Sequence, residues 1–121
     1  LAPAIVAASL KVFDIISSSN KLITKLNDNK SLFRTKMTNL GFDLKEGDHP
    51  IIPVMLYDAK LAQKMAKKLF EKGVYVVGFF YPVVPKEQAR IRVQISAAMS
   101  INDIEKAVNA FEEVGKSLNI I

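Results

Sequence analysis

The chain contains no cysteine, and this absence excludes several kinds of chemistry at once. Without thiols it can form no disulfide bond, no thiolate metal site and no cysteine nucleophile. Its only histidine, His49, lies between Asp48 and Pro50, and one histidine without cysteines provides too few ligands for a convincing metal site. We therefore interpret His49 as a structural or solvent-exposed residue and expect no bound metal.

The sequence also lacks a long hydrophobic run. Its longest apolar stretches, residues 1–10 and 74–84, are shorter than the roughly 20 residues that a membrane-spanning helix needs. The first residue is not methionine, and no basic segment precedes the apolar start, so this start does not resemble a signal peptide. We expect a soluble piece of a longer protein that is neither secreted nor bound to a membrane.

Motifs for phosphate binding and for hydrolysis are missing too. The sequence has no Gly-rich phosphate loop, no Walker lysine motif and no G-x-S-x-G turn. The net charge of +5 comes from lysines that are scattered along predicted helical surfaces rather than gathered in one block. A solvated surface accounts for this charge, and we expect no nucleic-acid partner.

The chain does have enough apolar sequence for one folded domain, since half of its 121 residues are hydrophobic. Pro3 suits the first turn of a helix that continues to Ile16. The apolar residues of this helix occupy nearly every side, so we expect it to have partners on more than one side. A second helix is predicted between an N-cap within residues 17–20 and Gly41, while residues 27–30 weaken its pattern and leave a break there open.

Beyond Gly41 the sequence alternates between strand and helix patterns. The expected elements are a strand over 51–57, a helix over 59–72 capped by Asp58, a strand over 74–78, an ordered apolar loop over 79–89, a strand over 90–96 and a helix capped by Ser100 and Asp103. Gly115 is expected to weaken the last turn of that helix. The helical crossover between the first two strands leaves room for the third strand to insert antiparallel between them. We predict an α+β fold, with a small antiparallel sheet of the split β-α-β type that helices cover on one face and two helices precede.

The last predicted strand carries the clearest candidate for a binding site. Ile91 and Val93 point to one face of this strand, and Arg90, Arg92 and Gln94 point to the other. An arginine on a central strand is costly to bury unless it pairs with a carboxylate or a phosphate. Either an anion binds at this face, or the arginines form salt bridges or contact water.

Two segments resemble the C-terminal domain of the α-oxoamine synthases, which are pyridoxal phosphate enzymes of aminotransferase fold type I. They are Gly-Phe-Phe-Tyr-Pro-Val-Val-Pro at residues 78–85 and Ala-Arg-Ile-Arg-Val-Gln-Ile-Ser-Ala-Ala at residues 89–98, and the likeness extends over nearly the whole chain. Residues 1–6 and 49–56 are most similar to those members that interconvert 2-amino-3-oxobutyrate and coenzyme A with glycine and acetyl-CoA, in threonine breakdown.

This resemblance implies roles for particular residues. Arg92, the second arginine of the R-[I/L]-R strand, would bind the α-carboxylate of the substrate, whereas Arg90 would not. The loop would lie near the active-site mouth and move when coenzyme A binds; it consists of Tyr81, Pro82, Val83, Val84 and Pro85. A guanidinium can hold a carboxylate through two parallel hydrogen bonds, so Arg92 would position the substrate rather than transfer protons.

The resemblance also implies an organisation for the whole protein. Residues 1–40 would be connecting helices that link to a large domain outside this sequence, and residues 41–121 would be the C-terminal small domain. The parent protein would be a homodimer in the cytoplasm or the mitochondrial matrix, with pyridoxal phosphate as its cofactor.

The sequence departs from the family pattern at two points. The Schiff-base lysine of the family, in a G-T-x-x-K-A run, has no counterpart here, so the chain alone is expected to be inactive. Met99 occupies a position where members commonly have histidine. Two alternatives stay open: a free-standing basic α+β module that binds nucleic acid, and a regulatory domain that binds an amino acid through the same arginine.

Overall fold

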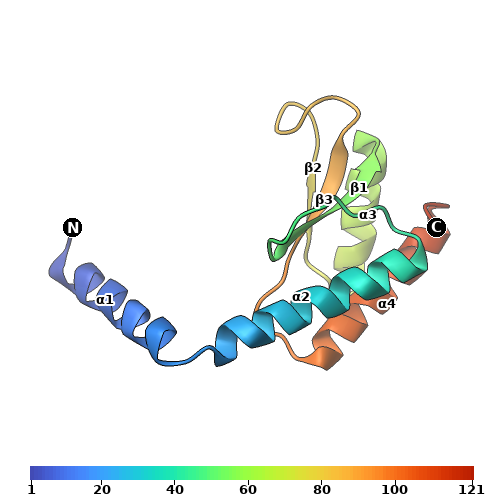
Figure 1. Cartoon of the computed structure of the whole chain (residues 1–121). Coiled ribbons are helices and arrows are strands. Elements are labelled where there is room, and N and C mark those ends of the chain that lie inside the picture. Colours follow the sequence, from blue (N-terminus) through green and yellow to red (C-terminus); the bar gives the residue numbers. More distant parts are fainter.

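The computed structural model describes all residues, 1–121, and shows a small sheet packed against helices (Figure 1). The elements follow in the order α1 (Pro3–Ser18), α2 (Lys21–Leu40), β1 (Ile51–Tyr57), α3 (Ala59–Glu71), β2 (Val77–Phe79), β3 (Ala89–Gln94) and α4 (Ile101–Ser117). This confirms the predicted α+β fold with two leading helices.

The sheet has the predicted topology, because β3 lies between β1 and β2 and is antiparallel to both. The strand predicted over residues 74–78 is wrong in its bounds, since β2 begins only at Val77. The N–H of Val74 instead donates to the carbonyl of Leu69 and closes the end of α3. Val74 and Val76 pack against the core from this connection, which explains why their segment is apolar without being a strand.

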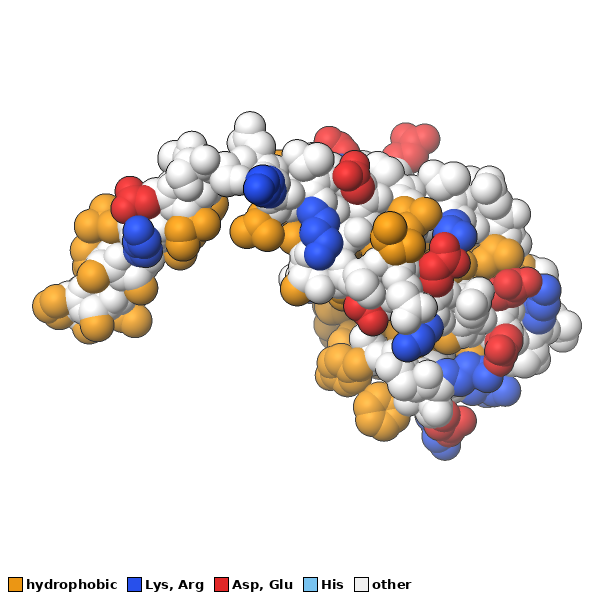
Figure 2. Space-filling view, turned by 90° about the horizontal axis from the view of Figure 1, so that it is seen from below, with side chains coloured by type: hydrophobic (Ala, Val, Ile, Leu, Met, Phe, Trp, Pro, Cys, Tyr) orange, Lys and Arg blue, Asp and Glu red, His pale blue; other side chains and the backbone are white.

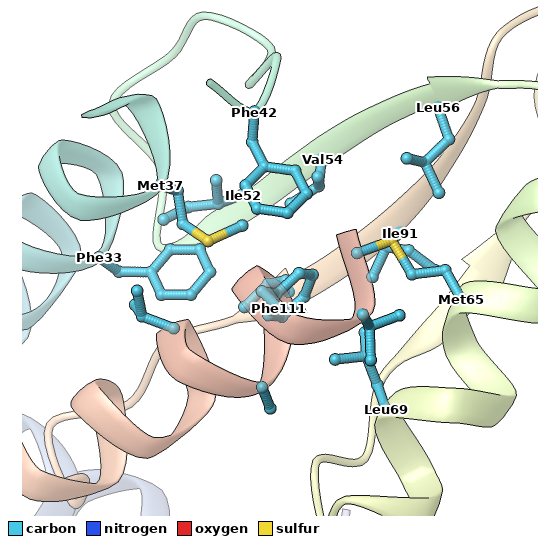
Figure 3. Close-up of a cluster of buried hydrophobic side chains, with 14 of the residues drawn as sticks. Phe33, Met37, Phe42, Ile52, Val54, Leu56, Met65, Leu69, Ile91 and Phe111 are labelled. Atoms are coloured by element: carbon cyan, nitrogen blue, oxygen red, sulfur yellow. The ribbon is translucent and has the colours of Figure 1, made fainter. Parts of the chain in front are cut away.

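The core lies between one face of the sheet and helices α2, α3 and α4 (Figure 3). Phe111 of α4 is fully buried at its centre, with its ring edge-on to Phe33 of α2 at 6.0 Å and to Phe42 at 5.9 Å between ring centres. Alternate residues of the strands, such as Ile52 and Ile91, point from the sheet into this cluster. The hydrophobic effect of burying these side chains holds the helices on this face.

The helix ends follow the predicted capping chemistry. The side chain of Asp58 accepts a hydrogen bond of 2.8 Å from the N–H of Leu61 at the start of α3. Ser100 and Asp103 form a capping box at the start of α4, in which each side chain accepts from the backbone N–H of the other residue. These hydrogen bonds from Ser100 lower the pKa of Asp103, because they stabilise the ionised carboxylate.

Helix α2 runs without interruption through residues 27–30, where the sequence left a break open. Asn29 is buried there, and its amide donates hydrogen bonds of 3.0 Å to the carbonyls of Ser96 and Met99. The ammonium of Lys30, also buried, pairs with Asp48 and lowers the pKa of that carboxyl group. The polar residues that weaken the helical pattern are thus satisfied by the loops beside α2.

Helix α1 extends away from the rest of the chain and buries none of its residues (Figures 1 and 2). The predicted side-chain N-cap of α2 is not formed, since Asn20 makes no capping hydrogen bond. The exposed apolar side chains of α1 lie on several sides of the helix, and they include Ile5, Leu10, Val12, Phe13, Ile15 and Ile16. No helix of the chain combines the length and the apolar character needed to cross a membrane.

Gly115 of α4 has a role in packing. Gly115 does not end α4, which continues to Ser117; a Cβ atom at Gly115 would lie 2.6 Å from the ring of Phe42. Glycine there therefore permits close packing, contrary to the predicted weakening of the last turn.

Phe33 and Met37 of α2 belong to the core, so the predicted division between residues 1–40 and 41–121 passes through a packed unit. That residues 1–40 connect to a large domain stays a prediction.

Candidate functional site

The face of the sheet opposite the core is open and carries the arginines of β3. Paired residues of neighbouring strands share a face, and Arg92 is paired with Pro53 of β1 and Val77 of β2. In the next row, Arg90 is paired with Met55 and Phe79. The open face is thus an apolar surface on which the central strand places two guanidinium groups.

Proline is tolerated within β1 because of the edge on which it lies. The carbonyl of Pro53 accepts a hydrogen bond of 3.0 Å from the N–H of Lys45, outside the ladder with β3. Pro53 therefore directs its backbone groups away from β3, and its missing N–H leaves no ladder bond unmade. This geometry keeps β1 paired with β3 on both sides of the arginine row.

The side chain of Arg92 is exposed and forms no hydrogen bond or salt bridge within the chain. Its guanidinium carbon lies 5.5 Å from the centre of the Phe79 ring, over the face of that ring. Of the possibilities that the sequence left open, a salt bridge is therefore excluded within this chain. The donors of Arg92 are free to contact water or an anion.

Arg90 has a different environment although it shares the face. Its Nε donates a hydrogen bond of 3.0 Å to the carbonyl of Gln88, and a terminal nitrogen donates at 3.3 Å to the side-chain oxygen of the same residue. These bonds tie Arg90 to the loop that precedes β3. The two arginines are therefore not equivalent as anion ligands.

Two neighbouring hollows in the open face meet at Arg92. The first has a volume of about 340 Å³ and is lined by Tyr75, Val76, Val77, Phe79, Arg92 and Gln94. The second has a volume of about 310 Å³ and is lined by Ile51, Pro53, Phe79, Val83, Val84, Arg90 and Arg92. Phe79 and Arg92 belong to both hollows and separate them.

The structure brings only part of the predicted loop to this site. Val83 and Val84 line the second hollow together with Arg92. Tyr81, Pro82 and Pro85 are exposed and line neither hollow. The loop is ordered by local contacts, including a hydrogen bond of 2.9 Å from the N–H of Val83 to the carbonyl of Phe80 and the ammonium of Lys86 at 5.2 Å from the Tyr81 ring centre.

Phe79 belongs to the site although it was not predicted as a site residue. The prediction that Phe79 and Ala89 lie in the apolar loop is wrong, since both belong to strands. The signal was the spacing from Val77, because residues two apart in a strand share a face. Met99, at the position where a histidine is common in the family, packs against the core and does not line either hollow.

The charges of the open face suit an anion such as a carboxylate. Pyridoxal phosphate additionally requires a lysine for its covalent linkage, and none of the three strands carries a lysine. No three His, Asp or Glu side chains of the chain are grouped as a metal site would need. The residues of this chain therefore fit a carboxylate ligand but do not by themselves fit the cofactor.

Comparison with known proteins adds independent information. Residues 1–111 match the model of a family described as aminotransferase class I and II. The chain is 54% identical over 121 residues to 2-amino-3-ketobutyrate coenzyme A ligase of Escherichia coli (strain K12), which covers 100% of this chain and 30% of that protein. It is 49% identical over 116 residues to the mitochondrial ligase of the same name from Mus musculus, covering 96% of this chain and 28% of the relative.

A relative with a different name is also similar. The chain is 46% identical over 121 residues to 8-amino-7-oxononanoate synthase of Thermosipho melanesiensis, covering 100% of this chain and 31% of the synthase. The chain thus spans about 30% of the length of the curated relatives that it matches.

Solved structures share the fold. A low-resolution structure of SPT matches 100% of this chain and 34% of its own chain, with a TM-score of 0.93 and 24% identity, and this likeness of fold includes α1. A high-resolution structure of SPT with PLP matches 81% of this chain and 25% of its own chain, with a TM-score of 0.78 and 27% identity.

Proposed function

The chain belongs to the aminotransferase class I and II family, and from this premise we propose that it is the C-terminal part of a pyridoxal phosphate-dependent glycine C-acetyltransferase. Such an enzyme interconverts 2-amino-3-oxobutyrate and coenzyme A with glycine and acetyl-CoA. The identity of 54% to the Escherichia coli ligase, against 46% to the oxononanoate synthase, favours this reaction within the family.

The main structural support for this proposal is Arg92, whose unpaired guanidinium lies on the open face of the sheet between two hollows. In the proposed role it binds the α-carboxylate of glycine or of 2-amino-3-oxobutyrate. Two of its N–H groups donate in parallel to the two carboxylate oxygens, which fixes the position and the rotation of the amino acid. Arg90 does not perform this role because Gln88 already engages its guanidinium.

We propose that the whole protein, rather than this chain alone, binds pyridoxal phosphate. Pyridoxal phosphate supplies an electron sink for the bond that breaks at the amino-acid Cα. Its main contacts and the lysine that binds it covalently would lie in the part of the protein beyond this chain. The residues of this chain would bind and orient the substrate carboxylate.

We propose roles for residues 81–85 and for helix α1 in the whole protein as well. Val83 and Val84 flank the hollow beside Arg92, which supports a place for residues 81–85 at the active-site mouth, where coenzyme A would enter. The exposed apolar side chains of α1 support packing against a large domain in a homodimeric parent protein. The Mus musculus relative is named as mitochondrial, which supports the mitochondrial matrix as a location of the parent protein.

The test compares the two arginines in the complete enzyme that contains this chain. We expect Arg92→Ala to lower kcat/KM for glycine by about 100-fold, because removal of one partner of a hydrogen-bonded charge pair leaves the other uncompensated. Arg90→Ala should change it by less than about 5-fold. Steady-state kinetics with glycine varied at fixed acetyl-CoA gives both values, and equal small effects of the two substitutions would refute the assignment of Arg92.

A further inference from the structure

We infer that Phe79 is a positioning residue for Arg92, whose ring sets the orientation of the guanidinium that receives the substrate carboxylate. The inference rests on the proposed function of Arg92 and deepens it. It assigns to the site a residue that makes no polar contact with the substrate.

The contact between the two side chains is specific to Arg92. The Arg92 guanidinium lies over the Phe79 ring at 5.5 Å, within the range of a cation–π interaction. Phe79 is paired across the sheet with Arg90 rather than Arg92, so the ring reaches the guanidinium diagonally. Since the side chain of Arg92 has no hydrogen bond or salt bridge in the chain, the contact with this ring is what orients the guanidinium.

Phe79 itself is held on a rigid element. Its strand pairs with β3, and the preceding Gly78 lies close to α3, because a Cβ atom at Gly78 would be 3.4 Å from the carbonyl oxygen of Ala62. The backbone of β2 is thus fixed between β3 and α3. A half-buried ring on this backbone has little freedom to leave the guanidinium.

The chemistry of the pair suits a carboxylate site. A free arginine side chain has many rotamers, and fixing it on binding costs conformational entropy. An acidic residue could also fix Arg92, but it would occupy the same N–H donors that the substrate needs. An aromatic ring contacts the flat face of the guanidinium and takes no conventional hydrogen bond from the N–H groups, which lie in the guanidinium plane. These N–H groups therefore stay available to the substrate carboxylate.

The experiment measures glycine affinity in the complete holoenzyme by titration with glycine alone, followed through the absorbance of the bound cofactor. We expect Phe79→Leu to raise the Kd for glycine by about 3- to 30-fold, while the KM for acetyl-CoA and the Tm stay close to wild type. Phe79→Tyr keeps the ring and should stay within about 2-fold of wild type. Phe70→Leu, which removes an exposed ring that contacts Tyr75 rather than Arg92, is the control.

A double variant separates positioning from packing. If Phe79 acts through Arg92, Phe79→Leu should have no further effect on glycine affinity in an Arg92→Ala background. Additive effects, an equal loss of acetyl-CoA affinity, or a lower Tm without a selective loss of glycine affinity would overturn the inference. If Phe79→Leu does not fold, Phe79→Met, which keeps an unbranched apolar side chain, is tested by the same criteria.

The two proposals fail in different ways. If Arg92→Ala leaves glycine affinity unchanged, the proposed function of Arg92 is wrong and the role of Phe79 falls with it. If Arg92→Ala weakens glycine binding while Phe79→Leu does not, only the positioning role is refuted.

Discussion

The two faces of the three-stranded sheet differ in what contacts them, although alternate residues of the same strands build both. On one face Ile91 and Val93 of β3 are buried in one core cluster with side chains of α3 and α4. On the other, Arg90 and Arg92 project from the same strand over an apolar surface that no helix of this chain covers.

The covered face holds the domain together, and the open face is available for binding. Apolar side chains on the covered face can be replaced only at the expense of packing, since protein interiors are close-packed. The open face adds little to the packing of this chain, so it is free to carry charged residues. We therefore expect substitutions on the two faces to separate stability from ligand binding.

Substitutions on the covered face should have the largest effect on stability. Ile91→Ala should lower the free energy of unfolding by about 2–5 kcal/mol, because a fully buried side chain leaves a cavity. Arg92→Ala, one residue further on the other face, should change it by less than about 0.5 kcal/mol. Urea unfolding followed by circular dichroism measures both, and similar losses would show that the open face also contributes to stability.

A conservative substitution of Arg92 on the open face should affect activity and leave stability unchanged. In the complete enzyme, Arg92→Lys should still lower kcat/KM for glycine by about 10-fold or more, because an ammonium is a point charge without the planar fork of donors. The free energy of unfolding should not change measurably. Full activity of the lysine variant would mean that charge alone, rather than two parallel hydrogen bonds, holds the carboxylate.

The smallest effect concerns the pH dependence of the helix that covers the sheet. The pKa of Asp103 is lowered from its ordinary value of 3.8 by the hydrogen bonds from Ser100. A carboxyl group whose pKa is lower in the folded state stabilises the protein above its unfolded pKa, and this contribution is lost as the pH falls through the folded pKa. Asp103→Asn should therefore lower the urea midpoint near neutral pH but much less in acid.

The control for this prediction lies on the exposed helix. Asp14→Asn on α1, whose side chain makes no hydrogen bond or salt bridge, should reproduce the wild-type profile between about pH 3 and pH 6. If the difference between wild type and Asp103→Asn stays constant over this range, the capping carboxylate does not titrate as expected.

Much of this architecture could be predicted from the sequence because it rests on local chemistry. The alternation of Ile91 and Val93 with Arg90 and Arg92 predicted both faces of β3, and Asp58 and Ser100 predicted where two helices begin. Arg92 could be singled out by its strand position and by its resemblance to a family motif. These features depend on residues within one or two turns of each other in the sequence.

Other features depended on contacts between distant segments. The continuation of α2 through Asn29 and Lys30 could not be predicted, because the carbonyls and the carboxylate that satisfy these residues come from loops elsewhere in the chain. The role of Gly115 likewise depends on the approach of Phe42. Local propensity is a weak guide wherever a tertiary partner supplies the missing interaction.

Periodicity and capping are local, so they were enough to predict the order of the elements, the polarity of the two faces of β3 and the identity of the candidate arginine. Only the tertiary structure decided which arginine is free. The pairing of β3 with β2 brings Phe79 to Arg92, and the loop before β3 brings Gln88 to Arg90. Two residues that look alike in the sequence differ because their neighbours in space differ.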